Sequence, residues 1–174
     1  MDNLRDIEGQ NNSEKKRRIV FAVLSLIMMI LIFLFSAKNA DQSSEESLKV
    51  GIEVGKVVVR DFEKLPKPEQ INYARSIDFY VRKSAHFSEY ALLGILLFGA
   101  VFTIKRKMYA NALIALIIAM LYASSDEFHQ LFVPGRSGQI RDVLIDSSGA
   151  LTGILLLILV RAVILKIKNA GNLT

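Results

Sequence analysis

The segment DEFHQLFVPGRSGQIRDVLID (residues 126–146) decides how the chain is arranged, because it places a polar stretch between two long apolar segments. It holds one of the two histidines, four carboxylates, two arginines, two glycines and a proline. The Pro134-Gly135 pair predicts a turn, so the chain reverses direction within this segment. The apolar segments on either side, residues 108–125 and 143–165, are therefore predicted to be antiparallel helices whose polar ends meet.

Two further apolar segments, residues 19–37 and 84–104, lie nearer the N-terminus. A membrane-spanning helix needs about 20 residues to cross some 30 Å of hydrocarbon, and all four segments are close to that length. A signal peptide is the competing interpretation of residues 19–37. However, the nineteen uncharged residues there exceed the roughly 7–15 of a signal sequence, and more spans follow. The sequence thus predicts an all-α fold, a four-transmembrane-helix bundle.

The rest of the chain divides around these spans. We predict a cytoplasmic N-terminal tail (1–18), a membrane domain (19–168) and a short cytoplasmic tail (169–174). Residues 1–14 are polar and mixed in charge, which is typical of disorder.

The polar interlude between the first two spans, residues 38–81, is predicted to be an extracytoplasmic amphipathic helical segment. Hydroxyls and acids at residues 43–47 are typical of a helix start. After them, apolar residues and a glycine recur at spacings of three and four and form one stripe: Leu48, Ile52, Gly55, Val59 and Phe62. Two prolines at 66 and 68 end this helix, and apolar residues between 71 and 80 predict a second short one.

Basic residues indicate the orientation, because lysine and arginine are more frequent on the cytoplasmic side of a membrane. With a cytoplasmic N-terminus, ten basic residues lie at inner ends and five at outer ends. The inner set is Arg5, Lys15, Lys16, Arg17, Arg18, Lys105, Arg106, Lys107, Lys166 and Lys168, and the outer set is Lys38, Arg82, Lys83, Arg136 and Arg141. We therefore predict a multi-pass protein of a bacterial cell membrane with both termini cytoplasmic and residues 126–146 facing outward.

The composition agrees with a membrane protein. Apolar residues make up 52% of the chain and the mean hydropathy is +0.35, which is high for a soluble domain. The absence of cysteine excludes a disulfide framework, a thiolate zinc site and a cysteine nucleophile. The net charge of +5 comes mostly from residues beside apolar segments, so we expect membrane lipids and not nucleic acid as partners. The oligomeric state is left open.

Polar residues from three predicted spans should meet at the outer face. A charge near hydrocarbon is unfavourable, by about 2.5 kcal/mol or more at the centre of a span, so a cluster of charges there suggests a function. The candidates are Arg82, Lys83, His86, Glu89, Tyr90, Asp126, Glu127, His129, Gln130, Arg136, Asp142 and Asp146. Ion pairs that lock helix against helix are the structural alternative. Gly149 and Gly153 predict close helix packing.

Three kinds of chemistry are open to these residues. The spacings His86…Glu89 and Glu127…His129 match no established metal-binding signature, so we predict no metal site and no cofactor. Histidine–carboxylate pairs could perform acid–base catalysis, although no catalytic motif accompanies them. Arginines 82 and 136 could instead hold an anionic head group, because the guanidinium fork suits phosphate and carboxylate.

The order and spacing of these residues resemble the VanZ-like family of bacterial membrane proteins. The matching pieces are RKSAHFSEYALLG (82–94) and SSDEFHQLFVPGRSGQIRDVLIDSSGALTG (124–153), together with FSA at 35–37. The residues carried over are Arg82, Lys83, His86, Glu89, Tyr90, Asp126, Glu127, Gln130, Phe132, Arg136, Asp142 and Gly149. Asp146 departs from the pattern, since we expect asparagine at this position in the family.

The resemblance implies a small multi-spanning protein connected with the cell envelope. The family's namesake is associated with resistance to teicoplanin, a lipid-tailed glycopeptide that binds cell-wall precursors. We therefore expect a non-enzymatic protein that binds a lipid-linked cell-wall precursor or a lipoglycopeptide at its outer face and lowers glycopeptide susceptibility. A membrane enzyme acting on a lipid-linked or cell-wall substrate is one alternative, and a structural or partner-binding membrane protein is another.

Overall fold

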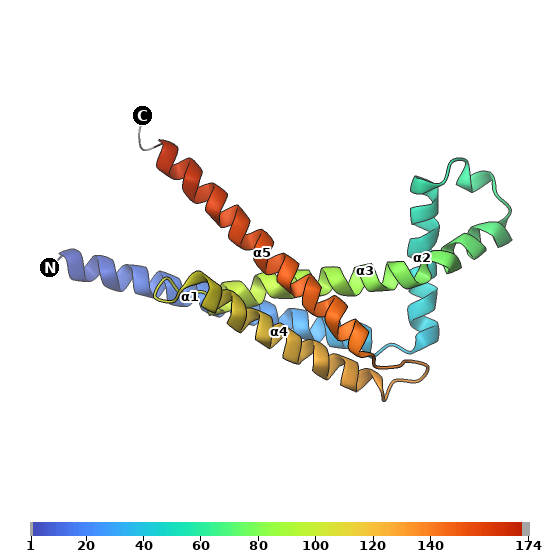
Figure 1. Ribbon diagram of the computed structural model, residues 1–174, viewed down its shortest axis with the longest axis horizontal. Helices are drawn as coiled ribbons and strands as arrows, with labels where there is room; N and C mark the ends of the chain where they lie inside the picture. Colours follow the sequence, from blue (N-terminus) through green and yellow to red (C-terminus); the bar gives the residue numbers. More distant parts are fainter. Residues whose placement is uncertain (1, 172–174) are drawn as a thin grey trace.

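The computed structural model describes residues 2–171, which form helices and loops without a strand. The described residues form five α-helices, and α2 lies across the end of the bundle made by the others (Figure 1). The elements in order are α1 (Asp2–Ser36), α2 (Ala40–Val58), the short 3₁₀ helix η1 (Phe62–Lys64), α3 (Lys67–Val101), α4 (Met108–Gln130) and α5 (Ile140–Gly171). The predicted all-α class is confirmed.

Four helices are long and apolar enough to cross a membrane: Asn11–Ser36 within α1, and the whole of α3, α4 and α5. The four predicted spans lie almost entirely within them. The expected disorder of residues 1–14 is wrong for residues 2–14, which belong to α1, while residue 1 lies outside the described residues. Because the segment contains no proline and is followed by Lys15–Arg18, which are good helix formers, the helix continues toward the N-terminus.

Helix α3 is longer than the span that the sequence predicts. It runs through 35 residues and joins the short helix expected at 71–80 to the span expected at 84–104. The expectation of two separate helices was wrong. The chain from Glu69 to Leu93 contains neither proline nor glycine, so nothing interrupts the helix there. Pro68 stands in the first turn of the helix, where its missing N–H is not needed.

Helix α2 is the predicted amphipathic helix of the interlude. Its first turn is capped by Asn39, whose side chain accepts a hydrogen bond of 2.9 Å from the backbone N–H of Gln42. The buried residues of α2 are Ser47, Gly51 and Gly55. Of these, only Gly55 belongs to the predicted apolar stripe, so the stripe identified the buried face only in part. A Cβ at Gly51 would touch Ala74 of α3, which shows that small residues bring the two helices together.

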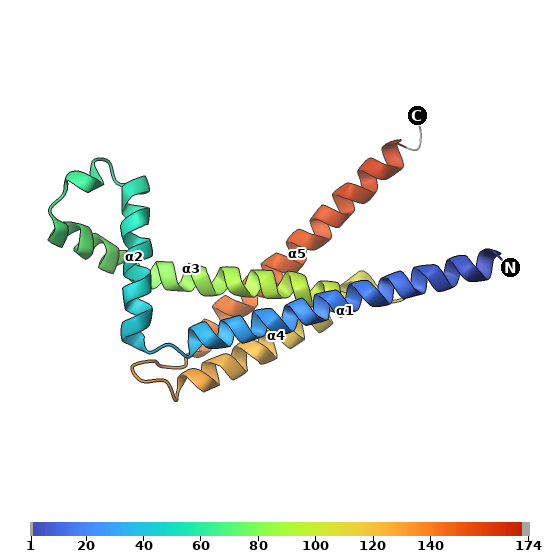
Figure 2. The ribbon, with the colours of Figure 1, turned by 180° about the vertical axis from the view of Figure 1, so that it is seen from behind.

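The most extensive helix–helix contact in the bundle is between α3 and α5. A Cβ at Gly149 would collide with the carbonyl oxygen of Phe87, and a Cβ at Gly153 would collide with that of Ala91. Gly94 on α3 faces the carbonyl of Ala150 in the same way. The predicted small-residue packing is therefore confirmed. Figure 2 shows from behind how α1 runs beside α3 and α4.

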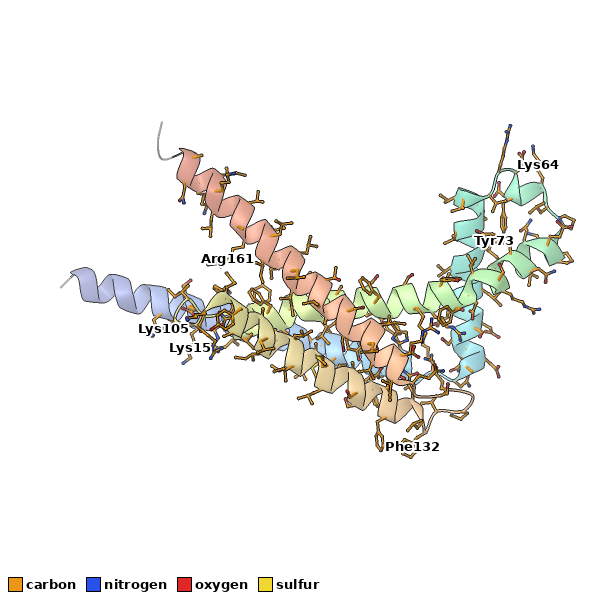
Figure 3. The ribbon with its side chains drawn as sticks, viewed as in Figure 1. Lys15, Lys64, Tyr73, Lys105, Phe132 and Arg161 are labelled. Atoms are coloured by element: carbon orange, nitrogen blue, oxygen red, sulfur yellow. The ribbon has the colours of Figure 1, made fainter. Side chains whose placement is uncertain are left out.

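The two ends of the bundle differ in character. Lys15 and Lys105 lie toward the end of the bundle where α1 begins and α5 ends, while Phe132 lies at the other end (Figure 3). We call the first the basic end, defined by residues 15–18 and 105–107. We call the second the polar end, defined by residues 82–90 of α3, 126–130 of α4 and 136–146. Between the ends, exposed apolar side chains cover α1, α4 and α5, as a lipid-facing surface requires.

The turn between α3 and α4 is held by one buried amide. Asn111 is fully buried, and its Nδ2 donates to the carbonyls of Thr103 and Arg106 at 3.1 and 3.2 Å. Its Oδ1 accepts from the backbone N–H of Thr103 at 3.3 Å. The side chain thereby satisfies backbone groups that the end of α3 leaves unpaired.

We expect Asn111→Ala to destabilise the protein by about 2 kcal/mol, because it leaves buried backbone groups without partners. Far-UV circular dichroism during unfolding in mixed detergent measures the change. Asn11→Ala is the matched control, since Asn11 is exposed and its loss should change stability little. Equal stability of the two variants would contradict the role assigned to Asn111.

Candidate functional site

Three helices supply the residues of the polar end. Residues 82–90 occupy successive turns of α3, residues 126–130 form the last turn of α4, and Asp142 and Asp146 stand in the first two turns of α5. Because α4 and α5 are antiparallel and joined by residues 131–139, their polar turns are adjacent. The structure therefore brings together most of the residues that the sequence singled out.

Two ion pairs lie at this end, one between two helices and one within α3. Lys83 Nζ lies 2.5 Å from Asp142 Oδ2 and thereby links α3 to α5. Arg82 Nη2 lies 2.6 Å from Asp78 Oδ2, one turn earlier on α3. Asp78 also accepts a hydrogen bond from the Ser47 hydroxyl of α2. These contacts position α2 and α5 on α3.

The loop between α4 and α5 is ordered by a chain of hydrogen bonds. Gln130 Nε2 donates to Glu127 Oε1 at 3.1 Å, and Glu127 Oε2 accepts from the backbone N–H of Gln139 at 2.9 Å. Arg136 donates to the Lys38 carbonyl at 3.1 Å through Nε and to Gln130 Oε1 at 3.5 Å through Nη1. Gly135 has a φ of 74°, which places a glycine where the turn needs a left-handed residue.

Arg136 provides a half-buried positive charge. Burial lowers the pKa of its guanidinium from the ordinary value, and the nearby charge of Arg82 lowers it further. An arginine remains charged despite such a shift, because its ordinary pKa lies above 12. Among the described residues, no carboxylate forms an ion pair with Arg136 within 4.0 Å. The side chain is therefore a cation available to an anionic group.

A second group of side chains lies deeper. One ring nitrogen of His86 and one oxygen each of Asp126 and Asp146 lie within 4.8 Å of one another. The two aspartates are only 2% and 1% exposed. Glu89 stands beside His86, with 3.8 Å between its Oε2 and the histidine Nδ1. The linear spacing of these residues could not reveal the group, because they come from three helices.

Two clefts open beside these residues. The first, of about 220 Å³, presents a mainly apolar surface to which Phe35, Val50 and Val81 contribute, and Glu46 and Glu89 also line it. The second, of about 200 Å³, is mainly polar and is lined by Lys83, Gln130, Gln139 and Asp142, among others. Both clefts share three residues, namely Arg82, His86 and Arg136. An apolar hollow and a polar hollow therefore meet at two arginines and a histidine.

Other candidates lie outside the clefts. His129 packs its ring against Phe33 of α1, with 4.5 Å between the centroids. Phe132 is 73% exposed at the tip of the α4–α5 loop (Figure 3). Tyr90 is fully buried in the core. Gly149 serves helix packing, as described above.

Sequence reasoning missed two partners of polar-end residues, namely Asp78 and the Lys38 carbonyl. Asp78 stands four residues before Arg82, so the helical spacing rule could have identified the pair. The Lys38 carbonyl could not have been found, because a backbone group carries no signal in the sequence.

Comparison with known proteins gives one match. The family model VanZ/LLP1 matches residues 21–161, which is most of the chain, and includes all the residues of the polar end. No curated protein and no solved structure matches the chain. The resemblance seen in the sequence is thus confirmed by a match that spans four apolar helices. The chain belongs to the VanZ/LLP1 family of multi-pass membrane proteins.

Proposed function

We propose that this protein binds a lipid-linked or lipopeptide ligand at the polar end and thereby lowers susceptibility to glycopeptide antibiotics such as teicoplanin. The observation that supports this proposal is the meeting of an apolar cleft and a polar cleft at Arg82, His86 and Arg136. An amphiphile has the same division into an apolar chain and a polar head. A lipid-linked cell-wall precursor and a lipoglycopeptide are both amphiphiles of this kind.

The charges suit an anionic head group. Arg82 is already paired with Asp78, so Arg136 is the cation that can form a new charge-assisted contact. A guanidinium can bind phosphate or carboxylate through two parallel hydrogen bonds. The apolar residues of the first cleft, including Phe35 and Val50, would hold the proximal part of the lipid chain.

The proposed orientation places this end outside the cell. Lys15–Arg18 and Lys105–Lys107 gather at the basic end, where both termini lie (Figure 3). The excess of basic residues on the cytoplasmic side then puts the termini in the cytoplasm and the polar end at the outer face. That face is where cell-wall precursors and glycopeptides are encountered.

Drug susceptibility tests the proposal. A host lacking the gene would express wild type, Arg136→Ala or His86→Ala at matched membrane levels, and would be challenged with teicoplanin and vancomycin side by side. Removal of a charge-assisted hydrogen bond lowers affinity by about 10- to 100-fold, so both variants should lose the protection that wild type gives.

Arg60→Ala is the matched control, because the Arg60 side chain is 98% exposed and lies outside both clefts. It should protect like wild type. Full protection by Arg136→Ala and His86→Ala would contradict a role for the clefts. No protection by wild type would refute the link to glycopeptides and leave the structural or partner-binding alternative.

A membrane enzyme remains the second candidate function, and the buried group of His86, Asp126 and Asp146 favours it. Such a group could transfer protons to and from a substrate in the clefts. This alternative predicts turnover of a lipid-linked substrate by the purified protein. Asp126→Asn should abolish the turnover, and a chromatographic assay of the lipid would detect it.

A further inference from the structure

No cation of the described residues forms an ion pair with the two carboxylates in the group formed by His86, Asp126 and Asp146. Two carboxylates are almost completely buried within one side-chain cluster. Of the nearest cations, Lys83 is paired with Asp142 and Arg82 with Asp78. Arg136 donates to the Lys38 carbonyl and to Gln130. A buried charge without a partner is strongly unfavourable, so the group requires another source of positive charge.

The hydrogen bonds at the group are also incomplete. Asp126 Oδ1, Asp146 Oδ2 and His86 Nδ1 are buried without a hydrogen-bond partner among residues 2–171. The fully buried hydroxyl of Tyr90 has no partner in this part of the chain either, and it lies within electrostatic reach of both aspartates. Buried polar atoms nearly always have partners, so four such atoms in one place point to a bound species.

The geometry fits a metal ion. Ligands on opposite sides of Zn²⁺ are separated by about 4.0–4.4 Å, twice the metal–ligand distance. The three ligand atoms here lie within 4.8 Å of one another, so small side-chain movements bring them to binding distance. Imidazole favours transition metals over magnesium and calcium, while carboxylates also bind zinc and manganese. We propose that His86, Asp126 and Asp146 bind a divalent transition-metal cation, with Zn²⁺ or Mn²⁺ the best match to this ligand set.

Neighbouring residues support the site. Glu89 lies beside His86, with its Oε2 3.8 Å from the histidine Nδ1, and adds a third carboxylate next to the group. His86 lines both clefts, so an ion can reach the group from either of them. The sequence spacing predicted no metal site, and the proposal departs from that prediction because the three ligands come from α3, α4 and α5.

Metal analysis of the purified full-length protein tests the proposal. The protein in detergent would be stripped with a chelator, incubated with Zn²⁺ or Mn²⁺, freed of excess ion and analysed by mass spectrometry for metal content. We expect stoichiometric uptake of at least one of the two ions. Thermal unfolding should shift upward by several degrees at saturating metal, because the ion binds only the folded chain. Circular dichroism is suitable, since the chain has no tryptophan for fluorescence.

The variants separate the site from nonspecific binding. Asp146→Asn should weaken the affinity by at least about tenfold and remove the thermal shift, because the loss of a direct ligand costs more than that of a supporting residue. Asp126→Asn should have the same effects, and it replaces Asp146→Asn in the test if that variant does not fold. Glu127→Gln is the control, since Glu127 is a buried carboxylate whose two oxygens are already hydrogen-bonded. It should retain the metal.

The proposal would be overturned by folded wild-type protein that takes up neither ion, which would mean that the aspartates are neutralised by protons. The proposal would also be overturned if Glu127→Gln lost as much metal as Asp146→Asn. That result would mean that the overall negative charge of the polar end binds the ion, without specific ligands. Because the measured quantity is metal content, the result does not depend on whether the protein changes drug susceptibility.

Discussion

Gly149→Leu is expected to abolish the packing of α3 against α5 and to prevent accumulation of folded protein. A side chain at this position points at the Phe87 carbonyl, which is backbone and cannot move aside without displacing α3. Overpacking of a core costs roughly 1–3 kcal/mol where side chains can adjust, and the cost here should reach or exceed the upper value. Membrane accumulation and far-UV circular dichroism during unfolding measure the loss.

Gly9→Ala is the control for this substitution, because a Cβ at Gly9 meets no other atom within 4 Å. It should leave stability unchanged or raise it by up to about 1 kcal/mol, since alanine favours helix more than glycine does. A fully stable Gly149→Leu protein would show that α3 and α5 do not pack as described.

The second large effect is expected from Lys83→Met. Lys83 lies 2.5 Å from Asp142, whose side chain is 9% exposed, so the substitution leaves a nearly buried carboxylate without its partner. Removing one member of a buried ion pair typically costs 3–5 kcal/mol, and we expect about 3 kcal/mol because Lys83 itself is partly exposed. Unfolding in mixed detergent, followed by circular dichroism, gives the value.

The double variant Lys83→Met/Asp142→Leu distinguishes the pair from the individual residues. It should recover most of the lost stability, because an apolar pair of similar size replaces the ion pair without leaving a charge behind. The coupling energy of the cycle should therefore exceed about 1 kcal/mol. Additive losses in the two single variants would mean that Lys83 and Asp142 act independently.

The sequence was sufficient to predict the number, order and approximate bounds of the spans, because uncharged runs near 20 residues leave few alternatives. Its errors concerned helix ends. Polar residues at 1–14 resembled a disordered tail, and residues 71–80 were predicted to form a short helix separate from the span at 84–104. Residues 2–14 and 71–80 both continue as helix, since hydropathy marks where a helix contacts lipid and not where its hydrogen bonds end.

The candidate site was predictable as a set of residues but not as an arrangement. Topology alone brought His86, Asp126 and Asp146 to the same end of the bundle. Their convergence depends on the rotation of each helix, which follows from contacts such as that of Gly149 with Phe87. His129 was selected with the others, yet it lies three residues after Asp126 on α4 and contacts Phe33. Three residues turn the helix by about 300°, so the side chains of Asp126 and His129 point about 60° apart.

The length of α3 has a mechanical consequence. Thirty-five residues make a rod of about 50 Å, whereas the hydrocarbon is about 30 Å thick. One end of the rod is therefore outside the bilayer, where α2 is fastened to it through Ser47 and Asp78. With neither glycine nor proline from Glu69 to Leu93, the part of α3 between its contact with α2 and His86 has no hinge. A force applied to α2 would therefore be transmitted along α3 and would change the position of His86.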